Sequence, residues 1–440
     1  MFDAFRTGAA IAALSLAGPA VAQLPFGPES QANSLTTYTQ QSPVVAAAPD
    51  GTFLVAWSSD WSNGNDHRSG SVQLRRFGNA GGPLGSEFQV NQDEGYDEHP
   101  TRIHVNATGR FKVMWNSVYN GPCCFLVGGS GRRYRPDGSP MADEFVVGGT
   151  AEYSGAPSTA ARPTGEFVAA RRIESEIEVR RFDARGSAQG EFMISPATSH
   201  YLFGPAVAVA PGGEFVVAWF DLDLGVEPWT SSIRARRYAA DASPVGGTIE
   251  VTGPGGADSP SSMSMARNAD GELIVVWSDS RPAGSDTSGS SVQARSFDAQ
   301  GLPLGARVQV NDLTLGAQTR PRVATGLDGG FVVVWQDGGS EYLEGGPRGV
   351  TDIEVRGRHL SADGTPRGSG FAVNSLSTGD QLHPDVAFLP GGNFVVVWRS
   401  DVSSGGDTDQ TSVQLRRFQT AFFADGFESG LLSRWVQGGD

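Results

Sequence analysis

One motif recurs along the whole chain and constrains its fold more than any other feature. It reads Pro-x-Val-Ala, then, after a short gap, Gly-x-Phe-Val-Val-Val-Trp, with a nearly unchanged apolar run. The seven copies begin at Pro43, Pro100, Pro157, Pro205, Pro260, Pro321 and Pro384 and end at Trp57, Trp115, Arg171, Trp219, Trp277, Trp335 and Trp398. These ends lie about 57 residues apart. Self-similarity at such a period is typical of an array of equal structural units.

Each repeat contains four candidates for β-strands. The motif supplies two, a segment of the type Ser-Val-Gln-Ala-Arg-x-Phe supplies the third, and a short segment ending in Val-Asn supplies the fourth. The run 331–335 is apolar without alternation, so both faces of that strand must be covered. Gly (59) and Pro (26) are abundant, as many short turns require. The sequence therefore predicts an all-β fold, a seven-bladed β-propeller of four-stranded antiparallel blades.

The two ends of the chain complement each other. The last repeat stops after its third strand at Phe418, and the missing fourth strand is found near the N-terminus, where residues 25–33 match residues 83–91. We therefore expect the N-terminal strand to close the ring, which removes the exposed strand edges of an open array. One arginine recurs in the third strand of every repeat, at Arg75, Arg132, Arg180, Arg236, Arg295, Arg358 and Arg416. We expect these arginines and the recurrent tryptophans to hold blades together, because a residue that serves one ligand would not recur in every blade.

The N-terminal 22 residues have the pattern of a secretory signal. Arg6 precedes an apolar stretch over 9–16, and the small-residue end Ala20-Val21-Ala22 follows. The sequence thus predicts a signal peptide (1–22), a propeller (23–420) and a tail (421–440) that is a sorting segment or a remnant. No segment approaches the 20 or so apolar residues of a membrane span. We expect a mature protein without a membrane span, secreted or periplasmic.

Over residues 25–418 the chain resembles the secreted bacterial β-propeller repeat proteins whose blades carry a Gly-x-Phe-Val-Val-Trp strand. The resemblance implies an exported seven-bladed protein of a mostly uncharacterised family. Propellers include binding scaffolds and enzymes alike, so the fold by itself does not decide the function.

Charge and loop placement narrow the candidate partners. The formal charge is −15 and the pI about 4.9, which opposes binding to nucleic acid or to anionic membranes. In a propeller, the loops between the second and third strands (B–C) and between consecutive blades (D–A) emerge on one face. These loops vary most here, and variable loops on a rigid scaffold usually carry binding. Candidate ligand-binding residues near the axial opening of this face are Asp97, His99, Arg320, Gln381 and His383.

Three B–C loops share aspartates separated by Gly and Ser, a composition that suits calcium. The candidate ligands are Asp60, Asp66, Asp279, Asp286, Asp401 and Asp407. None of the loops matches the regular twelve-residue calcium loop, and plain solvated turns are the favoured alternative. No other cofactor is expected. Cys123 and Cys124 are adjacent, so a disulfide between them would form a strained ring; free thiols are the alternative.

Two classes of function fit the sequence. We predict a monomeric, exported binding scaffold that presents a variable, acidic loop face to a glycan or protein at the cell envelope. The alternative is an extracellular glycoside hydrolase or lyase that uses carboxylates near the axial opening, with Asp97, Glu98 and Asp380 as candidates. The sequence contains no Gly-x-Ser-x-Gly, His-Glu-x-x-His or phosphate-loop motif. The balance therefore favours binding over catalysis.

Overall fold

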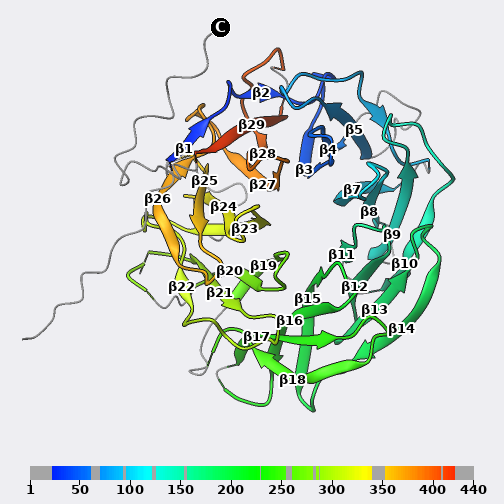
Figure 1. Cartoon of the computed structure of the whole chain (residues 1–440), viewed down its shortest axis with the longest axis vertical. Helices are drawn as coiled ribbons and strands as arrows, with labels where there is room; N and C mark the ends of the chain where they lie inside the picture. Colours follow the sequence, from blue (N-terminus) through cyan, green and yellow to red (C-terminus); the bar gives the residue numbers. More distant parts are fainter. Residues whose placement is uncertain are drawn as a thin grey trace, which may run out of the picture.

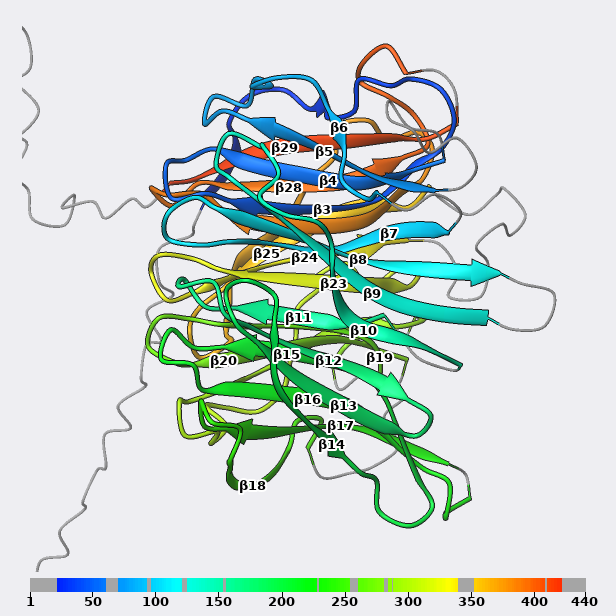
Figure 2. The same cartoon turned by 90° about the vertical axis from the view of Figure 1, so that its right-hand side faces the viewer.

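The computed structural model describes residues 22–60, 70–92, 96–120, 125–152, 156–227, 229–253, 260–280, 284–286, 288–338, 352–407 and 410–421. These residues form seven antiparallel sheets and no helix, and the sheets surround a central axis as blades (Figure 1). Figure 2 shows the strands running between the two faces of the ring. Within the same ranges, no helix is long and apolar enough to cross a membrane. The predicted seven-bladed β-propeller is confirmed.

The first four blades follow the order of the chain. Blade one contains β3 (Gln40–Ala47), β4 (Phe53–Ser59), β5 (Ser71–Phe77) and β6 (Phe88–Gln89). Blade two contains β7 (Asp97–Val105), β8 (Phe111–Asn120), β9 (Phe125–Tyr134) and β10 (Phe145–Glu152). Blade three contains β11 (Ser158–Ala161), β12 (Phe167–Ile173), β13 (Glu176–Phe182) and β14 (Ala188–Ile194). Blade four contains β15 (His200–Val209), β16 (Phe215–Asp223), β17 (Thr230–Tyr238) and β18 (Pro244–Glu250).

The remaining blades complete the ring. Blade five contains β19 (Pro260–Arg267), β20 (Leu273–Asp279), β21 (Ser291–Phe297) and β22 (Val308–Gln309). Blade six contains β23 (Gln318–Thr325), β24 (Phe331–Asp337), β25 (Glu354–Leu360) and β26 (Pro366–Ala372). Blade seven contains β27 (Gln381–Phe388), β28 (Phe394–Ser400) and β29 (Ser412–Ala421), together with β1 (Ala22–Pro25) and β2 (Ser30–Gln31) from the N-terminus.

The hydrophobic core lies between neighbouring blades. All seven residues of β4 and of β20 are buried, as the non-alternating apolar runs predict. Each core cluster joins two blades. In one of them, Ile274 and Val276 of blade five pack with Val333 and Trp335 of blade six. The apolar side chains of a blade are therefore buried against the neighbouring blades rather than within the blade itself.

The N-terminal segment closes the ring, as predicted. β1 and β2 both pair antiparallel with β29, for example through Gln31 and Gln414. The carboxylate of Glu29 accepts hydrogen bonds from the backbone N–H (2.6 Å) and the hydroxyl (2.7 Å) of Ser375, which follows blade six. The residue at the matching position of the internal repeat, Glu87, accepts one from the backbone N–H of Ser34 (2.6 Å). The two matching sequences thus make matching contacts.

Five of the seven recurrent arginines join blades, as predicted. In five blades Nη1 donates to a backbone carbonyl beside the outer strand of the preceding blade, at 2.7 to 3.1 Å: Arg75 to Ala32, Arg132 to Val90, Arg295 to Val251, Arg358 to Val310 and Arg416 to Val373. Arg180 of blade three differs. It pairs with Glu178 (2.9 Å) and Glu191 (2.8 Å) of its own blade. Glu178 also pairs with Arg171, which replaces the missing tryptophan, so this exception follows from the altered core of that blade.

The structure corrects the alignment of two repeats. In blade five the residue equivalent to Pro43 is Met263, because Met265 pairs with Val275 as Val45 pairs with Val55. Pro260 therefore lies three residues ahead of the motif position assigned from the sequence. In blade two, Pro100 lies one position early for the same geometric reason, since Ile103 pairs with Val113. Proline marks the strand start approximately, whereas the pairing register defines it.

Candidate functional site

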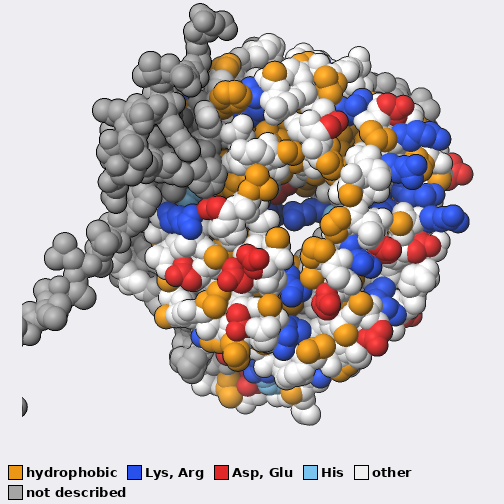
Figure 3. Space-filling view, viewed as in Figure 1, with side chains coloured by type: hydrophobic (Ala, Val, Ile, Leu, Met, Phe, Trp, Pro, Cys, Tyr) orange, Lys and Arg blue, Asp and Glu red, His pale blue; other side chains and the backbone are white. Residues whose placement is uncertain are grey.

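A pocket of about 490 Å³ lies on the axis, where the first strands of the blades begin. Figure 3, which views the ring from the face opposite the D–A loops, shows a hollow at its centre with basic side chains inside it. The residues that line the pocket come from every blade and include Ser42, Val44, His99, Arg102, Asn116, Ser158, Ala206, Met263, Ser264, Arg320, Arg322, His383 and Asp385. Because these strands start on the side of the D–A loops, the pocket lies on the face that the sequence predicts for binding.

A bulge recurs in the first strand of the blades, and in blades one, six and seven the residue at the bulge lines this pocket. In blades one, four, five, six and seven, the strand pairing shifts at the bulge. The residue there has a positive φ in each case: Ser42 (52°), Gly204 (53°), Ser262 (30°), Arg320 (51°) and His383 (53°). A left-handed conformation costs about 1 kcal/mol or more for a non-glycine residue. Because the bulge recurs, its backbone conformation is a property of the fold. The blades differ in the side chain of the residue at the bulge.

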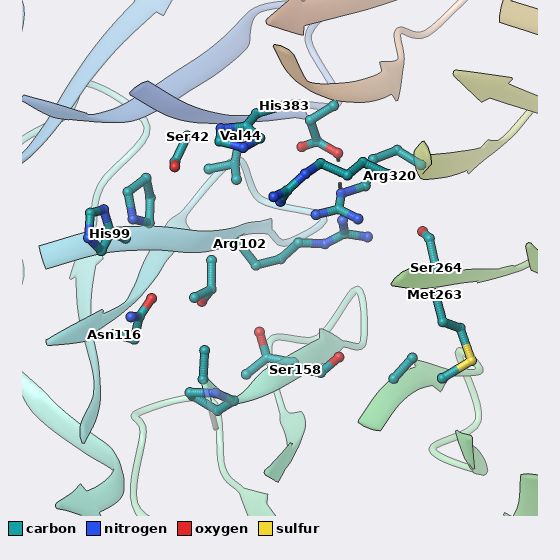
Figure 4. Close-up of a pocket in the computed structure, with 18 of the residues that line it drawn as sticks. Ser42, Val44, His99, Arg102, Asn116, Ser158, Met263, Ser264, Arg320 and His383 are labelled. Carbon is teal, nitrogen blue, oxygen red and sulfur yellow. Dashed lines mark ion pairs between the residues drawn. The ribbon is translucent and has the colours of Figure 1, made fainter. Parts of the chain in front are cut away.

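The charged side chains in the pocket are mostly cationic. Asp385 is the single carboxylate among the lining residues, against three arginines. It accepts the backbone N–H of Val45 in the next blade (2.9 Å) and lies 4.0 Å from Nη1 of Arg102. Arg322 also interacts electrostatically with Asp385 and with the other two arginines. Figure 4 shows Arg102 extending from β7 toward the side of the pocket where Arg320 and His383 lie.

Two histidines that line the pocket are held neutral. Burial and the neighbouring Arg320 lower the pKa of His383 to about 3. Burial also lowers the pKa of His99, although Asp97 opposes the shift. Nδ1 of each ring is buried without a hydrogen-bond partner among the described residues. With both rings neutral, the lining side chains carry three positive charges and one negative. The pocket can therefore accept an anionic group.

Three of the five predicted ligand-binding residues line this pocket, namely His99, Arg320 and His383. The other two lie elsewhere. Asp97 accepts the backbone N–H of Gly70 (3.2 Å), and Gln381 is fully buried, where it accepts the indole N–H of Trp398 (2.8 Å). Gln381 thus supports the recurrent tryptophan from within the blade.

The candidate carboxylates of the alternative, enzymatic function do not line the pocket either. Glu98 is fully buried near Asn91, and Asp380 accepts the backbone N–H of Ile353 (3.1 Å). The expected acidic character of this face also does not extend to the axial pocket. The sequence interpretation missed Arg102, Arg322 and Asp385. These three residues occupy the same position in their blades. An alignment of the repeats by strand pairing, rather than by their prolines, therefore brings them together.

Four of the five described aspartates that were predicted to bind calcium have protein partners. Asp286 accepts hydrogen bonds from Asn311 (2.8 Å) and from the backbone of Ser288 (3.0 Å). Asp279 lies 3.6 Å from Arg307, Asp401 pairs with Arg399 (2.9 Å), Asp407 bonds to Asn33 (3.0 Å), and Asp60 is exposed. No group of three potential metal ligands occurs among the described residues. Asp66, Cys123 and Cys124 lie outside them, so calcium and the disulfide stay predictions, checked by unfolding in calcium against chelator and by intact mass with and without reductant.

Comparisons with known proteins agree with the fold. No protein-family model and no curated protein matches the sequence. Among solved structures, a protein of unknown function from Dyadobacter fermentans is similar over 91% of this chain and 100% of its own, with 12% identity and a TM-score of 0.54. An ulvan lyase, a polysaccharide lyase bound to -[GlcA(1-4)Rha3S]-, is similar over 89% and 95%, with 9% identity and a TM-score of 0.51. An α-L-arabinofuranosidase from Fusarium graminearum has 12% identity over 88% and 97% and a TM-score of 0.47.

These identities are low, so the similarities establish the architecture alone. The chain is a seven-bladed β-propeller with a cationic pocket on its axis.

Proposed function

We propose that the protein binds an acidic glycan, one that carries carboxylate or sulfate groups, in the axial pocket. The observation that carries the proposal is the placement of Arg102, Arg320 and Arg322 in one pocket with a single carboxylate, in a chain whose formal charge is −15. Guanidinium groups match carboxylate and sulfate geometry with two parallel hydrogen bonds. The ulvan lyase of the same architecture, bound to a uronate- and sulfate-bearing repeat, supports this substrate class.

The pocket chemistry favours binding over processing. Glycoside hydrolysis generally uses two facing carboxylic groups, and Asp385 is the one carboxylate among the lining residues. A lyase needs a base that removes a proton next to a carboxylate. A histidine such as His383, whose pKa is about 3, is a weak base at neutral pH. Extracellular hydrolysis or elimination remains the second candidate because acidic polysaccharides are substrates of enzymes with this architecture.

Calorimetric titration with two acidic probes, tetragalacturonate and a chondroitin sulfate tetrasaccharide, tests the proposal. We expect at least one to bind, and Arg320→Gln to weaken it tenfold or more, because a charged hydrogen bond is worth about 1.5–3 kcal/mol. Arg367→Gln is the matched control, since it removes one positive charge from β26, the outer strand of blade six, where Arg367 pairs with Asp328 (2.6 Å) and does not line the pocket. No binding of either probe, equal affinity for neutral cellotetraose, or equal losses in the two variants would overturn the proposal.

The same samples distinguish binding from processing. New reducing ends or unsaturated uronate, formed by the protein and lost in His383→Asn, would establish catalysis. Unchanged probes after prolonged incubation, with binding retained, support a scaffold. Export to the cell envelope stays part of the proposal and is tested by fractionation of cells that express the full chain.

A further inference from the structure

A second cavity, of about 370 Å³, lies between blades two and three. Its lining includes the turns at 106–110 and 162–165, which join the first two strands of these blades, so it opens on the face opposite the D–A loops. The charged and titratable residues that line it are His104, Arg110, Lys112, Arg133, Tyr134, Arg162 and Arg185. No carboxylate is among the residues lining this cavity.

The other repeats show that this cavity is a departure from the common pattern. At one equivalent position in each blade, a residue of the first strand pairs with a residue of the second strand. In six blades this cross-strand pair consists of an alanine and a larger aliphatic residue: Ala46–Leu54, Ala160–Val168, Ala208–Val216, Ala266–Ile274, Ala324–Val332 and Ala387–Val395. In blade two the same pair is His104–Lys112. Lys112 is also the only lysine of the chain. At this one place the apolar pair is therefore replaced by a histidine and a lysine.

This replacement is unfavourable without a compensating group. Lys112 is 6% exposed, its Nζ donates to the carbonyl of Gly165 and lies 5.5 Å from the centre of the Phe167 ring. No carboxylate among the described residues lies within 4.0 Å of this nitrogen. Glu166 and Asp183 act on it only from a longer range. A buried ammonium group without a counter-ion destabilises the folded state.

The groups around Lys112 add positive charge. Arg133 pairs with it across the sheet, and its buried Nε has no hydrogen-bond partner among the described residues. Burial and Arg133 lower the pKa of Lys112 to about 8. Burial also keeps the pKa of His104 well below its usual range, and its ring bonds to Thr159 (2.8 Å). In Figure 3, Lys and Arg side chains gather on the right-hand side of the ring, where blades two and three lie in Figure 1.

We propose that this cavity binds a tetrahedral oxyanion, of the phosphate or sulfate class, between Lys112 and the surrounding arginines. Such an anion supplies the missing counter-charge. It accepts hydrogen bonds from the ammonium group and from the forked guanidinium groups, while Arg110 and Arg185 are exposed at the opening and attract it. The site lies on the face opposite the axial pocket and does not depend on the glycan proposal.

Thermal unfolding with inorganic phosphate and with sulfate, against sodium chloride of equal ionic strength, tests the site. At a hundred times its dissociation constant, the anion should raise the Tm by about 3 °C for a chain of this size. Lys112→Met restores the apolar pattern of the other blades, so it should fold, with a higher Tm in chloride and no response to either anion. Arg133→Gln should also lower the response, whereas Arg76→Gln, the equivalent change in blade one, should leave it intact.

Because the chain has one lysine, its pKa can be followed directly. After reductive methylation with ¹³C-formaldehyde, the NMR signal absent from Lys112→Met reports this amine. Saturating phosphate should raise its pKa by one unit or more, which corresponds to a tenfold preference of the anion for the charged form. If neither anion raises the Tm above the chloride control, or if Lys112→Met keeps the same response, the proposal is wrong. A response confined to the polymer dextran sulfate would also overturn it, because it would indicate surface attraction without a cavity site.

Discussion

Closure of the ring can be tested at a single side chain. Glu29 lies between the two strands that the N-terminus adds to blade seven, and its carboxylate accepts two hydrogen bonds from Ser375. Glu29 is 8% exposed, so solvent screens these bonds little. A hydrogen bond to a charged acceptor contributes about 1.5–3 kcal/mol. We use the lower value for each, since Ser375 itself is exposed, and expect Glu29→Ala to lower the free energy of unfolding by about 3 kcal/mol.

The corresponding change in Tm is small because the chain is large. With an unfolding entropy of about 2.1 cal/mol/K per residue over roughly 400 residues, 3 kcal/mol corresponds to about 4 °C. Urea unfolding followed by tryptophan fluorescence measures the free energy, and hydrogen exchange locates the change. Glu87→Ala removes the equivalent carboxylate, which accepts a hydrogen bond from the backbone N–H of Ser34. It should cost a similar free energy, but only Glu29→Ala should speed exchange in residues 22–33. An unfolding free energy within 0.5 kcal/mol or so of the unchanged protein, or unaltered exchange there, would refute this account of closure.

The other predictions concern the blade contacts and the axial pocket. Arg358→Met loses hydrogen bonds to Val310 (2.7 Å) and Gly368 (2.9 Å), so it should lower the free energy of unfolding in urea by about 2 kcal/mol. The buried Nε of Arg236 lacks a hydrogen-bond partner among the described residues, so Arg236→Met should lower this free energy by less than about 1 kcal/mol. Equal costs would contradict the bridging role. His383 has a pKa near 3 in the folded protein and about 6.5 when unfolded, so unfolding takes up a proton between these values and stability falls as the pH drops below 6.5. From pH 6.5 to 4.5 the loss should be about 2–3 kcal/mol larger than in His383→Asn, and parallel pH profiles would disprove the shift.

The architecture was predictable because its determinants are local and repeated. The matching segments at 25–33 and 83–91 placed the closing strand, and Glu29 and Glu87 make equivalent contacts in the structure. The candidate site was only partly predictable. Side chains in a strand alternate between two faces, so a shift of one residue reverses what faces the pocket. The bulge introduces such a shift between Gln381, which lies inside the blade, and His383, which lines the axis.

The missed arginines follow from the same cause. Arg102 and Arg322 are equivalent to Val44 once blades are aligned by pairing, but in blade two the proline lies one residue early. An alignment by prolines therefore assigns Arg102 to a different position and hides its equivalence to Arg322. Charge composition also misled, because a net charge of −15 describes the whole chain and says nothing about the sign of one pocket.

Each blade can be compared with the other six at equivalent positions. What a difference between blades means depends on whether the position faces the axis or lies between blades. Around the axis, the positions equivalent to Val44 line the pocket and differ from blade to blade, so no single residue there is informative alone. The evidence is that Arg102 and Arg322 at these positions converge with Arg320 of the bulge and with one aspartate. Between blades, the equivalent positions vary little. Six of the seven cross-strand pairs are alanine with an aliphatic residue, because close packing tolerates little change. A buried lysine at the seventh pair is therefore informative by itself: it places a charged group where the other six blades pack an aliphatic side chain, as the proposed anion site requires.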